Sequence, residues 1–140
     1  MTPKRLPPDD PREWLRRANS NLVHARDSSH GVCLEDLCFD AQQTAEKAIK
    51  SVFVLRGERF PLIHDLEDLL QRLERNGVKI PQYLWNAAEL SRFAVVTRYP
   101  GLSPLVTARK YRRAIRIAET VVRWAERLVE AAVKKRVGRK

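Results

Sequence analysis

Residues 34–59, LEDLCFDAQQTAEKAIKSVFVLRGER, decide the fold. Apolar side chains recur in this stretch at steps of three and four residues, which places them on one face of an α-helix. They are Leu34, Leu37, Cys38, Ala41, Ala45, Ala48, Ile49, Val52 and Leu55. Because alanines fill the middle of this face, a neighbouring helix can approach it closely. The pattern therefore predicts the central helix of an all-α bundle.

A second group of side chains lies about a quarter turn around the same predicted helix. It consists of Phe39, Gln42, Glu46 and Phe53. This group is too apolar for a helix that only covers the outside of a domain, so we expect it to meet a second partner, either another helix or another subunit. In the second case Phe39, Gln42 and Phe53 form the interface, and the amide helps to fix its register. The remaining polar side chains are predicted to face away from the core: Glu35, Asp40, Gln43, Lys47 and Lys50.

Two of the surrounding helices have clear start signals. The first opens at Asp10, which can cap it, while Pro11 suits the first helical position and Glu13 can complete a capping box. Its predicted core face is Trp14, Leu15, Ala18, Leu22 and Ala25. The third helix starts at Asp65 and stops at Gly77. Its apolar stripe is Leu66, Leu69, Leu70 and Leu73.

Two more helices are predicted in the second half of the chain. One begins near Pro81 and ends before Pro100, because a helix rarely continues through the residue ahead of a proline. It packs through Leu84, Ala87 or Ala88, Ser91, and Ala94 or Val95. The last begins between residues 103 and 107 and runs to about residue 134. Its apolar stripe is longer than the other helices can cover, so its end is expected either to project with a basic tail or to pack on a second copy of the protein.

These signals predict a five-helix up-and-down bundle with a long C-terminal helix. Its parts are a flexible arm over residues 1–9, a helical domain over residues 10–134 and a basic tail over residues 135–140. A chain of 140 residues with 44% hydrophobic and 31% charged residues fits one soluble domain. It contains no apolar run of about 18 residues and no leader-like N-terminus, so we expect a cytoplasmic protein without a membrane segment.

The cysteines and histidines give no sign of a disulfide or a metal site. Cys33 and Cys38 are five residues apart on or beside one helix, and a disulfide between them would break that helix. No second cysteine pair and no histidine cluster has the spacing of a zinc site. We expect two reduced thiols, no metal and no cofactor.

The run CFDAQQTAEKAIKSVFVLRGERFPLIHDLEDLL, residues 38–70, resembles the HEPN domain family, the higher-eukaryote and prokaryote nucleotide-binding domain. The second helix of that family reads as an aromatic residue, Ala-Gln-Gln and Ala-Glu-Lys-Ala, followed by a glycine-containing turn and a His-Asp-Leu helix start. TRYPG, residues 97–101, is similar to the Arg-Tyr-Pro element that precedes its last long helix. The resemblance covers residues 14–129 and is to stand-alone bacterial or archaeal members. It implies a helical domain and three kinds of function: nucleotide-binding modules, antitoxin-controlled RNases and accessory subunits.

The first hypothesis is an RNase. Nucleases resembling this family carry an Arg, four to six residues and then a His, with the imidazole as general acid or base and the guanidinium at the scissile phosphate. Arg59 and His64 have this spacing, although they lie in the loop before the third helix. At the expected position, residues 98–101 are followed by no histidine. The alternative is that His64 bonds backbone at a helix start.

The second hypothesis is a module that binds nucleotide or RNA. The chain has a net charge of +10, and residues 105–140 hold twelve Lys and Arg against three Glu. The candidate phosphate contacts are Lys47, Lys50, Arg98, Arg109, Lys110, Arg112, Arg113 and Arg116, with Tyr99 able to stack on a base. The alternative is a solvated face in which Glu46 pairs with Lys50 and Glu119 pairs with Arg123.

Glu46 connects this hypothesis to the central helix. A carboxylate within an apolar group needs a partner, which is either Lys50 or a basic residue from another helix such as Arg98. If the resemblance extends to nucleotide binding, this polar seam beside Glu46 is the expected location.

The third hypothesis is assembly. Proteins resembling this one are often encoded beside a small nucleotidyltransferase and act with it as a pair. Together with the long last stripe, the resemblance implies a homodimer. We therefore predict an accessory protein that binds nucleotide or RNA and partners a nucleotidyltransferase. The alternatives are a metal-independent RNase toxin of a toxin–antitoxin pair and a structural helical dimer.

Overall fold

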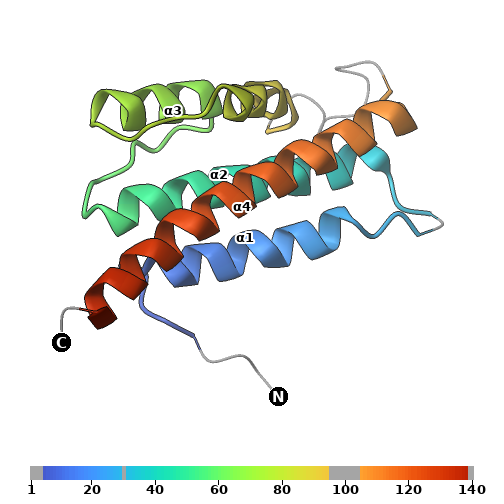
Figure 1. The fold of residues 1–140 in the computed structure, drawn as a ribbon. Helices are drawn as coiled ribbons and strands as arrows, with labels where there is room; N and C mark the ends of the chain where they lie inside the picture. Colours follow the sequence, from blue (N-terminus) through green and yellow to red (C-terminus); the bar gives the residue numbers. More distant parts are fainter. Residues whose placement is uncertain (1–4, 30, 95–104, 139–140) are drawn as a thin grey trace.

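Helices make up the regular structure of the computed structural model, which describes residues 5–29, 31–94 and 105–138 (Figure 1). Within these ranges there are four α-helices, one 3₁₀ helix and no strand. In chain order they are α1 (Pro11–Ala25), α2 (Leu34–Leu55), α3 (Leu66–Arg75), η1 (Gln82–Phe93) and α4 (Ala108–Gly138). The predicted all-α architecture with a long C-terminal helix is confirmed.

The alanine face of α2 lies at the centre, as predicted. Ala41, Ala45, Ala48 and Ile49 have no exposed surface. Both α1 and α4 pack on α2, and η1 and α3 contact it as well. Because the side chains in the middle of α2 are short, its neighbours can approach its axis closely. Leu34 and Leu55, at the two ends of the predicted face, are only half-buried against the core.

The start of α1 differs from the prediction in one respect. Asp10 caps the helix and accepts a hydrogen bond from the Arg12 N–H. The expected capping box does not form, because the Glu13 carboxylate accepts from the Leu6 N–H and from Arg16 and Arg17 instead. The Arg16 guanidinium, followed by the Leu6 N–H, lowers the pKa of Glu13 to about 2. The described part of the predicted arm therefore folds onto α1.

The second half of the chain starts with α3, whose cap and end match the sequence pattern. Asp65 accepts hydrogen bonds from two N–H groups of the first turn, and Gly77 closes the end with a φ of +97°. The next element is a 3₁₀ helix, η1, where an α-helix was predicted. Its buried residues recur at every third position: Leu84, Ala87, Leu90 and Phe93. This spacing matches the 3.0-residue turn of a 3₁₀ helix, so the predicted 3.6-residue stripe was wrong.

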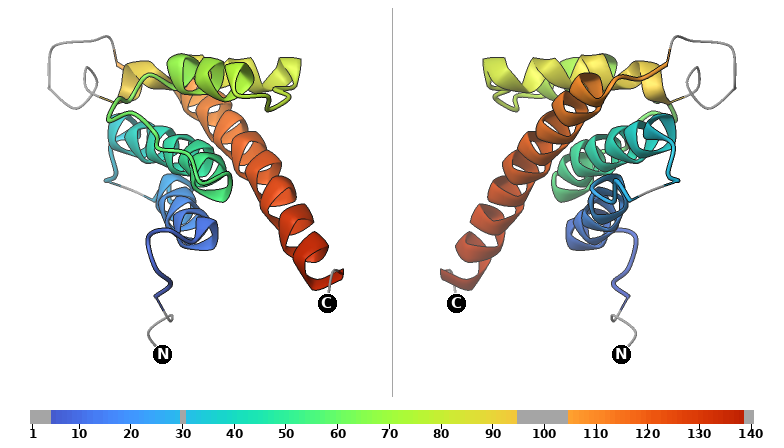
Figure 2. Two further views of the ribbon diagram at one scale, coloured as in Figure 1. Left: turned by 90° about the vertical axis from the view of Figure 1, so that its left-hand side faces the viewer. Right: turned by 90° about the vertical axis from the view of Figure 1, so that its right-hand side faces the viewer.

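Helix α4 is the longest element and extends past the predicted end. Thr107 accepts a hydrogen bond from the Lys110 N–H at its start, and the helix reaches Gly138, so residues 135–138 continue it. Figure 2 shows that its C-terminal half diverges from α1 and α2.

No helix in the described ranges combines the length and apolarity needed to cross a membrane. Both cysteines are free, and burial raises the pKa of Cys38 to about 12.

Candidate functional site

A buried polar cluster lies on the flank of α2, where the sequence predicted a polar seam. Glu46 is 5% exposed and accepts a hydrogen bond from Lys50 Nζ at 2.9 Å. Its other carboxylate oxygen accepts from Gln42 Nε2 at 2.9 Å and lies 2.8 Å from Nδ1 of His64. Lys50 is therefore one partner of Glu46, as predicted. The other candidate, Arg98, lies outside the described residues.

The loop between α2 and α3 covers this seam. The Phe60 ring lies over Lys50 Nζ, with 4.9 Å to the ring centroid. Edge-on contacts join Phe60 to Trp14 of α1 and to Phe53 of α2, with centroids 5.1 and 6.5 Å apart. Lys50 is only 6% exposed. Its ammonium is thus not presented to phosphates, contrary to the prediction, because the carboxylate and the ring enclose it.

The interface prediction for the same flank is resolved in favour of an intrachain contact. Gln42 and Phe53 are buried within the chain at 0% and 1% exposure. They are not available to a second subunit. Phe39 is half-buried.

The electrostatics of Glu46 follow from these contacts. Burial by itself would raise its pKa, but the hydrogen bonds from Lys50, Gln42 and His64 outweigh that effect and hold the pKa below its ordinary value. A lowered pKa in the folded state means that the ionised cluster stabilises the protein above pH 4.5, and this stabilisation is lost as the pH falls through the folded-state value.

The two residues of the nuclease hypothesis have different surroundings. His64 contacts Glu46 rather than backbone, while 62% of its side chain is exposed. Arg59 is exposed on the same loop. A carboxylate that holds one ring nitrogen fixes the imidazole orientation and leaves the other nitrogen facing outward.

Lys47 lies on the other side of the seam, toward α1. Its Nζ donates to Asn21 Oδ1 at 2.6 Å, and Asn21 donates in turn to Asp40. Burial, together with the nearby Arg17 guanidinium, lowers the pKa of Lys47. Lys47 and Arg17 line a pocket of about 420 Å³, which Arg5 and Trp14 also line.

The predicted cationic cluster lies at the start of α4. Arg109, Lys110, Arg112 and Arg116 are exposed. Arg113 differs, because it forms a two-point ion pair with Glu89 of η1, with both N–O distances at 2.7 Å. The other predicted contacts, Arg98 and Tyr99, fall outside the described ranges. Across those ranges, no three His, Cys, Asp or Glu side chains gather to hold a metal ion.

The comparisons with known proteins agree with this fold. A family model described as HEPN domain matches residues 11–128. The chain belongs to the HEPN domain family. The crystal structure of TT1696 from Thermus thermophilus is similar at 32% identity and a TM-score of 0.75, over 85% of this chain and 98% of that one. ST0689, described as an archaeal HEPN homologue, is similar at 25% identity and a TM-score of 0.69, over 91% and 99%. No curated protein matches the chain.

The structure extends the cationic cluster of this HEPN domain beyond the predicted residues. The predicted pair between Glu119 and Arg123 is wrong, because Glu119 binds Arg26 at the end of α1. Arg123 and Arg127 are exposed on the same face as the earlier arginines. We call this row the arginine stripe; it consists of Arg109, Arg112, Arg116, Arg123 and Arg127. Steps of three, four, seven and four residues place it on one side of α4, over about 27 Å.

A substitution tests the buried pair of this HEPN domain. Glu46→Gln leaves the Lys50 ammonium buried without a countercharge, so we expect the free energy of unfolding in urea to fall by about 3–5 kcal/mol. The double variant with Lys50→Met removes both charges and should lose less. Glu74→Gln, at an exposed position of α3, is the control and should change the free energy by less than about 0.5 kcal/mol. Wild-type stability for Glu46→Gln, or a double variant weaker than the single, would contradict the role assigned to the pair.

Proposed function

We propose that this HEPN protein is an accessory protein that binds RNA along the arginine stripe. The supporting observation is the row of exposed guanidinium groups on one face of α4, none of which pairs with a carboxylate in the described part of the chain. Guanidinium groups bind phosphate oxygens by paired hydrogen bonds, and a row of them matches an extended polyanion. Arg127 also donates to the hydroxyl of Tyr83, which is 46% exposed and offers a ring for base stacking.

Unpaired cations distinguish the stripe from an ordinary solvated helix face. Such faces usually place acids four residues from bases, and like charges at that spacing destabilise a helix. On α4 the nearby acids are directed elsewhere, since Glu119 binds Arg26 and Glu126 lines a pocket next to α1. No described acid therefore offsets the repulsion between Arg112 and Arg116, and a bound polyanion would reduce it.

The same proposal includes nucleotides. The pocket beside Lys47 is lined by three cations, one acid and the Trp14 ring. Arg17 pairs with the acid, Glu13, so Arg5 and Lys47 are the candidate phosphate contacts, and Trp14 offers a stacking surface. Lys47 donates to a neutral amide there and makes no ion pair with any described residue, so we infer that its charge can bind a phosphate.

RNA titrations at several salt concentrations test the stripe. A variant with Arg109, Arg112, Arg116 and Arg123 changed to Gln should bind single-stranded RNA more weakly and lower the slope of log K against log salt by about 3, because each phosphate contact contributes about 0.7. The matched control changes four exposed cations elsewhere, Arg72, Arg75, Lys79 and Arg92, to Gln. Equal losses in the two variants would show non-specific charge attraction, and unchanged binding in the stripe variant would refute the proposal.

We also propose that the protein works with a small nucleotidyltransferase, which the family membership supports. Co-expression with the product of the neighbouring reading frame should then yield a complex that survives size-exclusion chromatography. If that product is no nucleotidyltransferase, or if the two proteins elute separately, this part of the proposal fails while RNA binding stands.

A second candidate function is metal-independent RNA cleavage, favoured by the contact between Glu46 and His64. This candidate predicts that labelled RNA is cleaved in EDTA, and that His64→Ala slows the reaction by about 10²–10⁴-fold through loss of the general acid or base. Arg59→Gln should also slow it, through loss of the positive charge at the phosphate. His24→Ala changes an exposed histidine of α1 and is the control. Absent cleavage, or cleavage that His64→Ala leaves intact, eliminates this candidate.

A further inference from the structure

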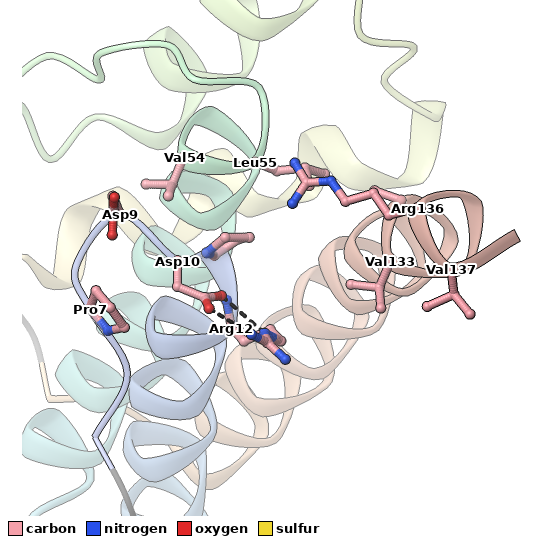
Figure 3. Close-up of a pocket in the computed structure, with 11 residues that line it drawn as sticks. Pro7, Asp9, Asp10, Arg12, Val54, Leu55, Val133, Arg136 and Val137 are labelled. Atoms are coloured by element: carbon pink, nitrogen blue, oxygen red, sulfur yellow. Dashed lines mark hydrogen bonds and ion pairs between the residues drawn. The ribbon is translucent and has the colours of Figure 1, made fainter. Parts of the chain in front are cut away.

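Two pockets that α4 lines differ in the ligands that they suit. One, of about 570 Å³, lies between the N-terminal segment and the end of α4 (Figure 3). Its charged members are two acids and two bases, Asp9, Asp10, Arg12 and Arg136, and no aromatic ring lines it. The other, of about 280 Å³, lies between η1 and α4, and no acid lines it. This η1–α4 pocket adjoins the arginine stripe, because Arg116 belongs to both.

The 3₁₀ form of η1 explains where the η1–α4 pocket lies. Residues three apart are eclipsed in a 3₁₀ helix, so Tyr83, Asn86 and Glu89 form one row along η1. The two outer members of this row bind arginines of α4. Tyr83 accepts a hydrogen bond from Arg127 at 3.1 Å, and Glu89 forms the two-point ion pair with Arg113. The row therefore faces α4, and Asn86 lies between the two bridges.

Short polar side chains leave the middle of this row open. The two bridges join η1 and α4 in opposite chain directions, so Asn86 lies across from the middle of residues 113–127, where Thr120 lines the same pocket. The Thr120 hydroxyl donates to the Arg116 carbonyl at 2.9 Å, and its oxygen can still accept. No hydrogen bond joins the Asn86 amide to another described residue. The pocket thus offers an amide that both donates and accepts, beside a hydroxyl oxygen that accepts.

The other walls of the pocket suit a flat aromatic ligand. Leu84 and Val121 are each 1% exposed, and Ile117 is 8% exposed, so the inner wall is apolar. At the rim, Tyr83 presents a half-exposed ring that Arg127 holds through the hydroxyl. Apolar and aromatic surface with a few convergent polar groups is typical of small-molecule sites, and about 280 Å³ is close to their lower limit. The pocket therefore suits one planar group of the size of a nucleobase.

We propose that the η1–α4 pocket takes one unstacked nucleobase of the RNA whose phosphates the arginine stripe binds. This inference rests on the proposed function and adds which form of RNA is bound. Bases in a duplex are stacked and paired, so only a single strand, loop or bulge can turn a base into the pocket. Tyr83 stacks on that base, and Asn86 bonds its edge and acts as a specificity residue.

Fluorescence anisotropy with three probes tests the stacking surface: a single-stranded RNA, its duplex with the complementary strand, and inorganic polyphosphate, which has no bases. Wild type should bind the single strand more tightly than the duplex. Tyr83→Ala should weaken single-strand binding by about 10–100-fold. Its salt slope and its Kd for polyphosphate should not change, because no phosphate contact is lost. Tyr83→Phe keeps the ring and should retain most of the affinity, and circular dichroism checks that both variants are folded.

Asn86→Asp tests the base edge, because a carboxylate accepts hydrogen bonds and cannot donate them. Cytosine has an amino donor where uracil has a carbonyl oxygen, so the ratio of oligo(C) to oligo(U) affinity should rise by about tenfold. Gln82→Glu is the matched control. It makes the same change of charge at an exposed position of η1 that does not line the pocket, and it should leave the ratio unchanged.

The outcomes separate this inference from the proposed function. Equal or tighter binding of the duplex overturns the base pocket. Single-strand binding that Tyr83→Ala leaves intact overturns it too, as does a base ratio that Asn86→Asp does not change. In these cases RNA binding by the stripe stands, since its own test is the loss of affinity and of salt dependence when the arginines are replaced. A wild-type protein that binds no RNA refutes both.

Discussion

The structure depends on the close packing that the small side chains of α2 permit. Ala41, Ala45 and Ala48 have no exposed surface, and α1 and α4 contact the same helix from different sides. Enlarging a side chain in such an interface costs about 1–3 kcal/mol, because the helices cannot move apart without losing the rest of the core. The close approach also fixes which side chains of α2 remain on its flank. Glu46 and Lys50 lie at the edge of the core, where each neutralises the charge of the other.

This edge explains the course of the loop between α2 and α3. Taking two opposite charges out of water costs free energy, which their attraction repays only when the pair has good geometry and the remaining hydrogen bonds are satisfied. Gln42 and His64 supply hydrogen bonds to Glu46, and Phe60 covers Lys50. The loop therefore has a structural reason to pass over α2, and His64 is placed beside a carboxylate as a consequence. His64 thus has a structural role through its contact with Glu46, and a catalytic role would be additional to it.

The sequence predicted the helix faces that follow from local hydrophobic periodicity. It did not predict the hydrogen bonds and ion pairs for which several donors compete. The central face was predictable because its residues follow the 3.6-residue repeat. The 3₁₀ form of η1 was missed because alanines at positions 87 and 88 fit a stripe of either period. Glu13 was assigned to the capping box and Glu119 to Arg123. Glu13 instead accepts from Arg16, Arg17 and the Leu6 N–H, and Glu119 binds Arg26 through a tertiary contact. Local pairing rules describe an isolated helix, and in a bundle another element can offer a better-placed donor.

The wrong partner predicted for Glu119 has the larger consequence, because it concerns how acidic and basic side chains are distributed around α4. A helix that carries many arginines can reduce their repulsion by interleaving acids, yet here Glu119 binds Arg26 at the end of α1 and Glu126 lines a pocket next to α1. The acids of α4 are thus directed toward other elements, and the arginines are left together on the outer face. The acids that could lower the charge of the stripe are those that face other elements, so α4 presents a positive outer side and a less charged inner side without any change in its net charge.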